Sequence, residues 1–228
     1  MSQPDSGSSG TSIDHPRTHD GVRVDRVVTS GTFELDGGSW DVDNNVWVVG
    51  DDRECVVIDA AHDVDTILGA VGGRAVRAIL LTHAHNDHIN VANDLAAATG
   101  APLHLHPDGR VLWALSQDGP PPEQTLTQGQ EFHVGHVAIR VLHTPGHAPG
   151  ACCFHVPALH VVFTGDTLFS GGPGATGRSF SSFDQIIESI REHLLTLPSG
   201  TVVLTGHGDS TTIGAEAPHL DEWIARGH

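Results

Sequence analysis

Apolar positions along this chain recur at two spacings, and the changes of spacing divide it into strands and helices. Short apolar runs bounded by Gly, Asp or Pro are typical of strands, and apolar residues three and four positions apart are typical of helices. The pattern predicts strands at 22–29, 45–49, 55–58, 75–81, 103–106, 131–134, 137–142, 151–156, 159–164 and 201–204. It predicts helices at 62–71, 89–99, 110–115, 183–197 and 215–225.

The order of these elements indicates an α/β fold. Strands 45–49 and 55–58 flank the turn 50–53 and form a predicted hairpin. From there strands and helices alternate, as they do in α/β layers. Each half of the chain begins with strands and continues with helix and strand. This order fits two stacked sheets with helices on both outer faces.

Composition narrows the classes of protein that this chain can represent. Residues 1–20 are polar and rich in Ser and Gly, so we expect a disordered arm and one folded domain over 21–228. No apolar run reaches the ~18 residues of a membrane helix. The three cysteines, Cys55, Cys152 and Cys153, are an odd set without a disulfide framework, which favours the reducing cytoplasm. The net charge of −17 argues against a nucleic-acid partner.

One segment after a predicted strand holds three histidines and an aspartate within six positions. It is Thr82-His83-Ala84-His85-Asn86-Asp87-His88. Imidazole and carboxylate are ligands of Zn²⁺, Fe²⁺ and Mn²⁺. His83 and His85 point the same way if the segment leaves the strand extended. Asp87 and His88 need a turn or a helix start after residue 85 to face a second position. The spacing therefore indicates two metals.

Three further predicted strands end at a residue of the same kind. His147, Asp166 and His207 each follow a strand through a glycine, a residue that permits a sharp turn and close backbone approach. Because parallel strand ends meet at one edge of a sheet, we expect these side chains to converge on the histidine segment.

With these motifs, the sequence resembles the metallo-β-lactamase-fold superfamily and, within it, the glyoxalase II-like hydrolases. The motifs that carry the resemblance are His83-Ala84-His85-Asn86-Asp87-His88, His143-Thr144-Pro145-Gly146-His147, Gly165-Asp166-Thr167-Leu168-Phe169 and Thr205-Gly206-His207-Gly208. It implies a four-layer αββα sandwich and two divalent ions, Zn²⁺ first, with Fe or Mn as alternatives. It also implies one metal on His83, His85 and His147, a second on Asp87, His88 and His207, and Asp166 bridging both.

The resemblance implies a hydrolytic mechanism as well. Two cations generate a bridging hydroxide that attacks a carbonyl, and a thiolate leaving group needs little protonation. Asp166 holds the metals, and Asp87 is the carboxylate that positions water or accepts a proton. Many β-lactam-hydrolysing members carry a cysteine near the position of Asp166, which argues against a β-lactamase. We expect a small thioester of a low-molecular-weight thiol, mycothiol-type rather than glutathione, and either a monomer or a homodimer.

Two alternative functions predict different sequence features. The persulfide dioxygenases share these motifs, use one iron and typically place an Asp soon after a Gly-Arg pair. Here Gly177-Arg178 is followed by Ser179-Phe180, which favours the hydrolase. A non-catalytic binding module would have lost ligands, whereas all seven are present.

Three residues near the motifs have open roles. We expect Asp59 to orient a loop rather than bind metal. His143 either forms a hydrogen bond behind the metal ligands or packs in its turn. Arg178, in the Gly-rich loop 170–180, either reaches an anionic or amide group of the substrate or ties the loop to a carboxylate.

Overall fold

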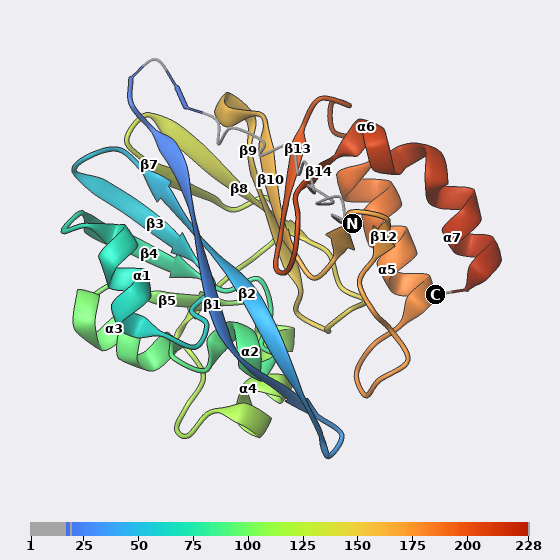
Figure 1. The fold of residues 1–228 in the computed structure, drawn as a ribbon, viewed down its shortest axis with the longest axis horizontal. Helices are drawn as coiled ribbons and strands as arrows, with labels where there is room; N and C mark the ends of the chain where they lie inside the picture. The colour runs from blue at the N-terminus through green and yellow to red at the C-terminus, as the bar shows by residue number, and fades with distance from the viewer. Residues whose placement is uncertain (1–16, 19, 228) are drawn as a thin grey trace, which may run out of the picture.

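Two six-stranded sheets pack face to face in the computed structural model, which describes residues 17, 18 and 20–227 (Figure 1). The first sheet has the order β1 (Arg23–Leu35), β2 (Gly38–Gly50), β3 (Glu54–Ile58), β4 (Ala75–Leu80), β5 (Leu103–Leu105), β6 (Gln124–Thr125). The second has the order β14 (Thr211–Thr212), β13 (Val202–Thr205), β10 (Val161–Gly165), β9 (Cys152–Val156), β8 (Val137–His143), β7 (Glu131–Val134). The strands β11 (Leu168–Phe169) and β12 (Gly172–Pro173) pair separately.

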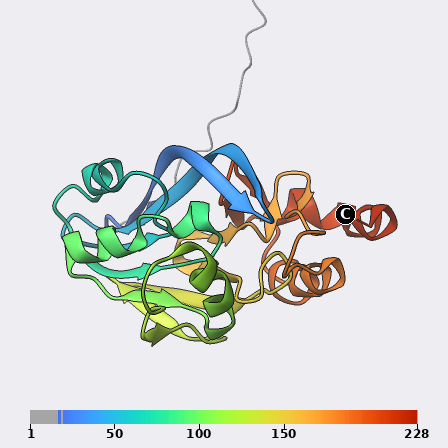
Figure 2. The ribbon, with the colours of Figure 1, turned by 90° about the horizontal axis from the view of Figure 1, so that it is seen from below.

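Alternation along the strands builds three hydrophobic cores, and these cores define four layers. In β3, Val56 faces the second sheet, while Val57 faces the helices of the first half. In β9, Phe154 faces the first sheet, and Cys153 faces the helices of the second half. Figures 1 and 2 show the teal-to-green helices beside the first sheet and the orange-to-red helices beside the second. The predicted αββα sandwich is confirmed.

Four of the five predicted helices are shorter or interrupted in the structure, and the fifth, 110–115, is present as α4 (Arg110–Ser116). The other helices are α1 (Val64–Val71), α2 (Asn86–Ile89), α3 (Ala92–Thr99), α5 (Phe183–Ser189), α6 (Ile213–Glu216) and α7 (Leu220–Arg226). The predicted helix 89–99 is broken, because the N–H of Val91 bonds to the carbonyl of Ala60. The predicted helix 183–197 passes from α5 into a π-helical turn, Ile190–Leu194. The predicted helix 215–225 is interrupted near Pro218, which has no N–H to donate.

The predicted hairpin of 45–49 and 55–58 is present as β2 and β3, but β1 and β2 form a second, long hairpin that the pattern does not predict. β1 and β2 pair from Arg23↔Gly50 to Leu35↔Gly38, whereas the pattern predicts strands only at 22–29 and 45–49. Asp36 and Gly37 form its two-residue turn, with φ of 53° and 79°. The outer half of the hairpin is rich in Gly, Ser and Asp. Its few apolar residues do alternate, Phe33 with Leu35 and Trp40 with Val42, but they are too few to mark a strand from the pattern. The Asp-Gly pair is the signal that predicts this turn.

The predicted arm 1–20 lies mostly outside the described residues, which begin at Arg17 and omit residue 19. Arg17 forms a bridge with Arg23, and Thr18 Oγ1 accepts a hydrogen bond from the N–H of Val22. Within the described part of the chain, no helix has the length and apolar character needed to cross a membrane. Cys55, Cys152 and Cys153 are buried free thiols.

Candidate metal centre

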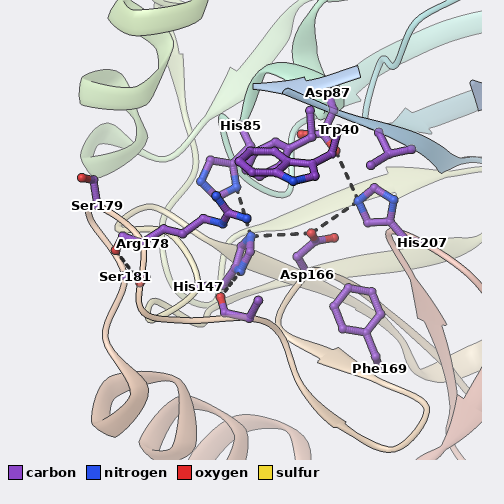
Figure 3. Close-up of a pocket in the computed structure, with 13 residues that line it drawn as sticks. Trp40, His85, Asp87, His147, Asp166, Phe169, Arg178, Ser179, Ser181 and His207 are labelled. Atoms are coloured by element: carbon purple, nitrogen blue, oxygen red, sulfur yellow. Dashed lines mark hydrogen bonds and ion pairs between the residues drawn. The ribbon is translucent and has the colours of Figure 1, made fainter. Parts of the chain in front are cut away.

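Four strand ends from the two sheets deliver the predicted ligands to one place (Figure 3). The segment after β4 carries His83 and His85, and α2 begins at Asn86 and turns the next two ligands inward. From the second sheet, His147 follows β8, Asp166 follows β10 and His207 follows β13. The fold thus brings together side chains separated by more than a hundred positions.

The first group consists of three imidazole nitrogens. His85 Nδ1 lies 3.0 Å from Nε2 of His83 and 3.0 Å from Nε2 of His147. Nitrogens that share one tetrahedral zinc ion at 2.0–2.1 Å lie roughly 3.3 Å apart. The separations therefore suit three ligands of one cation.

The second group joins two imidazoles and a carboxylate. Nε2 of His88 lies 3.1 Å from Nε2 of His207. Oδ2 of Asp87 lies 3.5 Å from the former nitrogen and 3.3 Å from the latter. This group has the donor set of a second divalent cation.

Asp166 stands between the two groups. Its Oδ2 lies 3.5 Å from Nε2 of His147 and 3.4 Å from Nε2 of His207, and its Oδ1 lies 3.3 Å from Nε2 of His88. Oδ1 of Asp166 and Oδ1 of Asp87 are buried without a hydrogen-bond partner. Buried carboxylate oxygens need a partner, and cations in the two groups would supply it. The residues therefore fit a pair of divalent ions.

The protonation states divide between the two groups. Burial lowers the pKa of His83 well below its usual value, and lowers that of His85 to about 3. Both rings are neutral and can coordinate a cation. Burial also lowers the pKa of His207, but the ion pair with Asp166 outweighs it and raises the pKa to about 10. A cation there must displace a proton.

Most of these histidines are oriented through the ring nitrogen that faces away from the site. Nδ1 of His147 donates to the carbonyl of Ala175, and Nδ1 of His207 donates to the carbonyl of Asp43, both at 2.8 Å. His88 uses Asp59 in the same way. Such bonds set the tautomer and leave Nε2 free for a metal.

A cavity of about 340 Å³ opens above the ligands. Phe33 and Trp40 from the long hairpin form one wall, and the loop carrying Arg178 forms another. Figure 3 shows Trp40 and Arg178 beside the ligands. The Arg178 guanidinium carbon lies 4.0 Å from the ring centre of Trp40 and 5.6 Å from that of Phe33. These are cation–π distances. The outer part of the hairpin, which the hydrophobic pattern missed, thus supplies the aromatic part of the cavity wall.

The structure places Asp59, His143 and Arg178 as follows. Asp59 accepts hydrogen bonds from Thr82 and His88 and belongs to none of the metal-ligand groups. His143 contacts the carbonyl of Pro149 and the ring of His106, not the metal ligands. Among the described residues, no carboxylate lies within 4.0 Å of the Arg178 guanidinium. The loop is tied to the hairpin instead by the N–H of Ser179, which donates to Asp36.

A buried hydrogen bond near the site has no signal in the sequence pattern. Asn44 Nδ2 donates to Oδ2 of Asp87 at 3.0 Å, and Asn44 Oδ1 lies 2.9 Å from Nε2 of His62. From the sequence we expect His62 to be a surface or packing residue. Asn44 differs from its neighbours in the pattern only as a polar residue beside an apolar run, which does not indicate its partner.

Comparisons with known proteins agree with this geometry. Residues 40–207 match the family model of the metallo-beta-lactamase superfamily. A probable metallo-hydrolase of Bacillus subtilis, YqgX, is 30% identical over 187 residues, which are 75% of this chain and 88% of that protein. The hydroxyacylglutathione hydrolase GloC of Haemophilus influenzae is 29% identical over 181 residues, 73% of this chain and 85% of that protein.

Solved structures are similar over most of the chain. The BLEG-1 B3 metallo-beta-lactamase superposes with a TM-score of 0.71 at 29% identity and covers 84% of this chain and 97% of its own. TTHA1623, solved in a di-iron-bound form, superposes with a TM-score of 0.67 at 34% identity and covers 77% of this chain and 93% of its own. With the layered fold and the His/Asp cluster, these matches show that the chain belongs to the metallo-β-lactamase superfamily of metal-dependent hydrolases.

Proposed function

We propose that this protein is a binuclear metal-dependent thioesterase that cleaves an acylated low-molecular-weight thiol. The observation that carries the proposal is the convergence of seven ligands in two groups joined by Asp166. Zn²⁺ is the first choice of metal, with Fe or Mn as alternatives. The di-iron form of TTHA1623 supports two ions in such a site.

A pair of divalent cations would supply an activated water and would polarise the substrate carbonyl. The protein's own residues then set the geometry. Asn44 holds Oδ2 of Asp87 and so fixes this carboxylate beside the second cation position, where it would position water. Burial raises the pKa of Asp87, but the charge of His88 and the hydrogen bond of His207 outweigh this effect and keep the pKa below its usual value. Asp87 is therefore ionised at neutral pH.

The cavity favours a thioester with an anionic or amide-bearing carrier. A thiolate leaves without strong acid help, because the pKa of a thiol lies near 8.5. Arg178 lines the cavity, and its guanidinium suits a carboxylate or amide oxygen. The name of the Haemophilus relative supports thioester chemistry. We propose a mycothiol-type carrier. We also propose that the protein acts in the cytoplasm, since the described cysteines are free thiols.

The test is metal content combined with turnover on S-acyl thiols, with a chromogenic β-lactam as a second substrate class. We expect two metals per chain and O₂-independent thioester cleavage that is lost in His83→Ala and Asp166→Ala. Full activity in either variant would exclude the mechanism. One iron with O₂ uptake would instead identify a persulfide dioxygenase, and β-lactam cleavage without thioester cleavage would identify a lactamase.

A further inference from the structure

The loop between β3 and α1 packs against α2, the short helix that carries Asp87 and His88. The N–H of Ala60 in this loop donates to the carbonyl of His88 at 2.9 Å. Asp59 and His62 of the same loop both have left-handed backbones, with φ of 64° and 62°. Residues other than Gly adopt this conformation only where the surrounding structure holds them in it. Asp59 holds His88 directly, whereas His62 is not yet accounted for.

The hydrogen bonds of the His62 side chain form a row that ends at Asp87. The ionised carboxylate of Asp87 can only accept, so the Asn44 group that contacts its Oδ2 at 3.0 Å is the Nδ2 donor. The Asn44 oxygen therefore faces Nε2 of His62 at 2.9 Å, and this nitrogen carries the ring proton. Nδ1 of His62 is then left with a lone pair, which accepts from Nδ2 of Asn90 at 2.8 Å. Every donor in the row meets an acceptor.

The His62 ring is fixed in one orientation. Oδ1 of Asn90 accepts the backbone N–H of His62 at 2.7 Å, so one amide group holds both the backbone and the ring. The ring also fills the space beside Gly31, where a Cβ atom would collide with it. Burial lowers the pKa of His62, which keeps the ring neutral and its Nδ1 lone pair available. The ring therefore presents a single tautomer to Asn44.

This row is directed at only one of the two ligand groups. Asn44 is fully buried, and the Asp87 oxygen that it holds is the one that lies 3.5 Å from Nε2 of His88 and 3.3 Å from Nε2 of His207. Among the described residues, the side-chain hydrogen bonds of Asn44 and His62 do not lead to the three histidines of the first group. An effect of His62 on metal binding should therefore be confined to the second position.

We propose that His62 is a positioning residue for the second cation. Through Asn44 it fixes the carboxylate of Asp87, and it thereby raises the affinity of the position formed by Asp87, His88 and His207. The inference rests on the two-ion part of the proposed function and not on thioester cleavage.

The experiment counts zinc ions bound to the full chain after dialysis against buffered free Zn²⁺. In His62→Met, which has no donor for Asn44, affinity for one of two ions should fall about 10-fold, as on loss of other residues that support metal ligands. The other affinity should stay native. His62→Gln has a side chain of the same length but keeps an N–H donor, so it should restore most of the lost affinity. His160→Met, at an exposed histidine with φ of 54°, is the control for backbone strain and should bind zinc like the native chain.

A double variant shows whether His62 acts through Asn44. We expect Asn44→Ala to weaken the same ion and the further change His62→Met to add nothing, because residues that act in series are not additive. Native zinc affinity in Asn44→Ala, additive losses, or a Gln variant no better than the Met variant would overturn the proposal while leaving the binuclear function intact. A native chain that binds a single ion would overturn both.

Discussion

Oδ2 of Asp59 lies 2.9 Å from Nδ1 of His88, and the carboxylate also accepts hydrogen bonds from the N–H and the hydroxyl of Thr82. Asp59 is 1% exposed and has a left-handed backbone with φ of 64°. One side chain thus joins the end of β3 to the start of the histidine segment. It holds the ring of His88 with Nε2 facing Asp87 and Asp166.

Replacing this carboxylate should weaken the second metal. In Asp59→Asn, an amide that donates faces the donors of Thr82 and His88, and a buried group left unpaired costs about 1–3 kcal/mol. Loss of such a partner typically reduces metal affinity by about 10–100-fold. Metal titration followed by kcat measurement checks this. Asp118→Asn, an exposed carboxyl, is the control, and equal metal affinity in both variants would contradict the role of Asp59.

Gly206 leaves no room for a side chain beside the candidate metal centre. A Cβ atom there would collide with Oδ1 of Asp166 and come within 2.8 Å of Cε1 of His88. We expect Gly206→Ala to lose most bound metal and nearly all activity. Gly200→Ala, where the space around the Cβ position is open, should behave like the native chain. A fully metallated Gly206→Ala protein would show that the centre tolerates this displacement.

Arg178 should act on substrate binding rather than on the chemical step. Its guanidinium stacks on Trp40 at the cavity wall, so Arg178→Met should raise KM for a carboxylate-bearing thioester by about 10-fold, roughly the value of one lost charged hydrogen bond. We expect kcat to change little and a neutral thioester to be unaffected. Arg191→Met, which removes a surface ion pair with Glu188, is the control. Equal effects on both substrates would contradict charge recognition.

Metal removal should make stability depend on pH through His207. Its pKa is about 10 in the folded, metal-free chain, against 6.5 ordinarily. Because the folded value is the higher one, this stabilisation is complete below pH 6.5 and is lost as pH rises through about 10. In chelated protein, the difference in melting temperature between the native chain and His207→Gln should therefore shrink from pH 6.5 to 10. A constant difference would contradict the ion pair with Asp166.

Metal binding should show the same linkage. A cation must displace the His207 proton, so affinity should rise with pH up to about 10. Calorimetry in buffers of different ionisation enthalpy measures the protons released, and zero release at pH 7 would contradict this assignment.

The sequence alone was sufficient for the layered fold and for the candidate ligands. Apolar runs mark buried strands because burial on both faces requires continuous apolar residues. His147, Asp166 and His207 follow such runs, so each could be placed at a strand end from local pattern. Helix ends were less predictable. The break at Val91, for example, depends on a hydrogen bond to Ala60, thirty-one positions away.

Only the tertiary structure decided what surrounds the ligands. The backbone pairing of the long hairpin carries Phe33 and Trp40 to the cavity. Asn44 of β2 contacts Asp87 of α2, and His106, after β5, contacts His143 of β8. Periodicity reports which face of an element is buried. It does not report which polar side chains meet when two sheets pack, because that depends on the register and packing of distant strands.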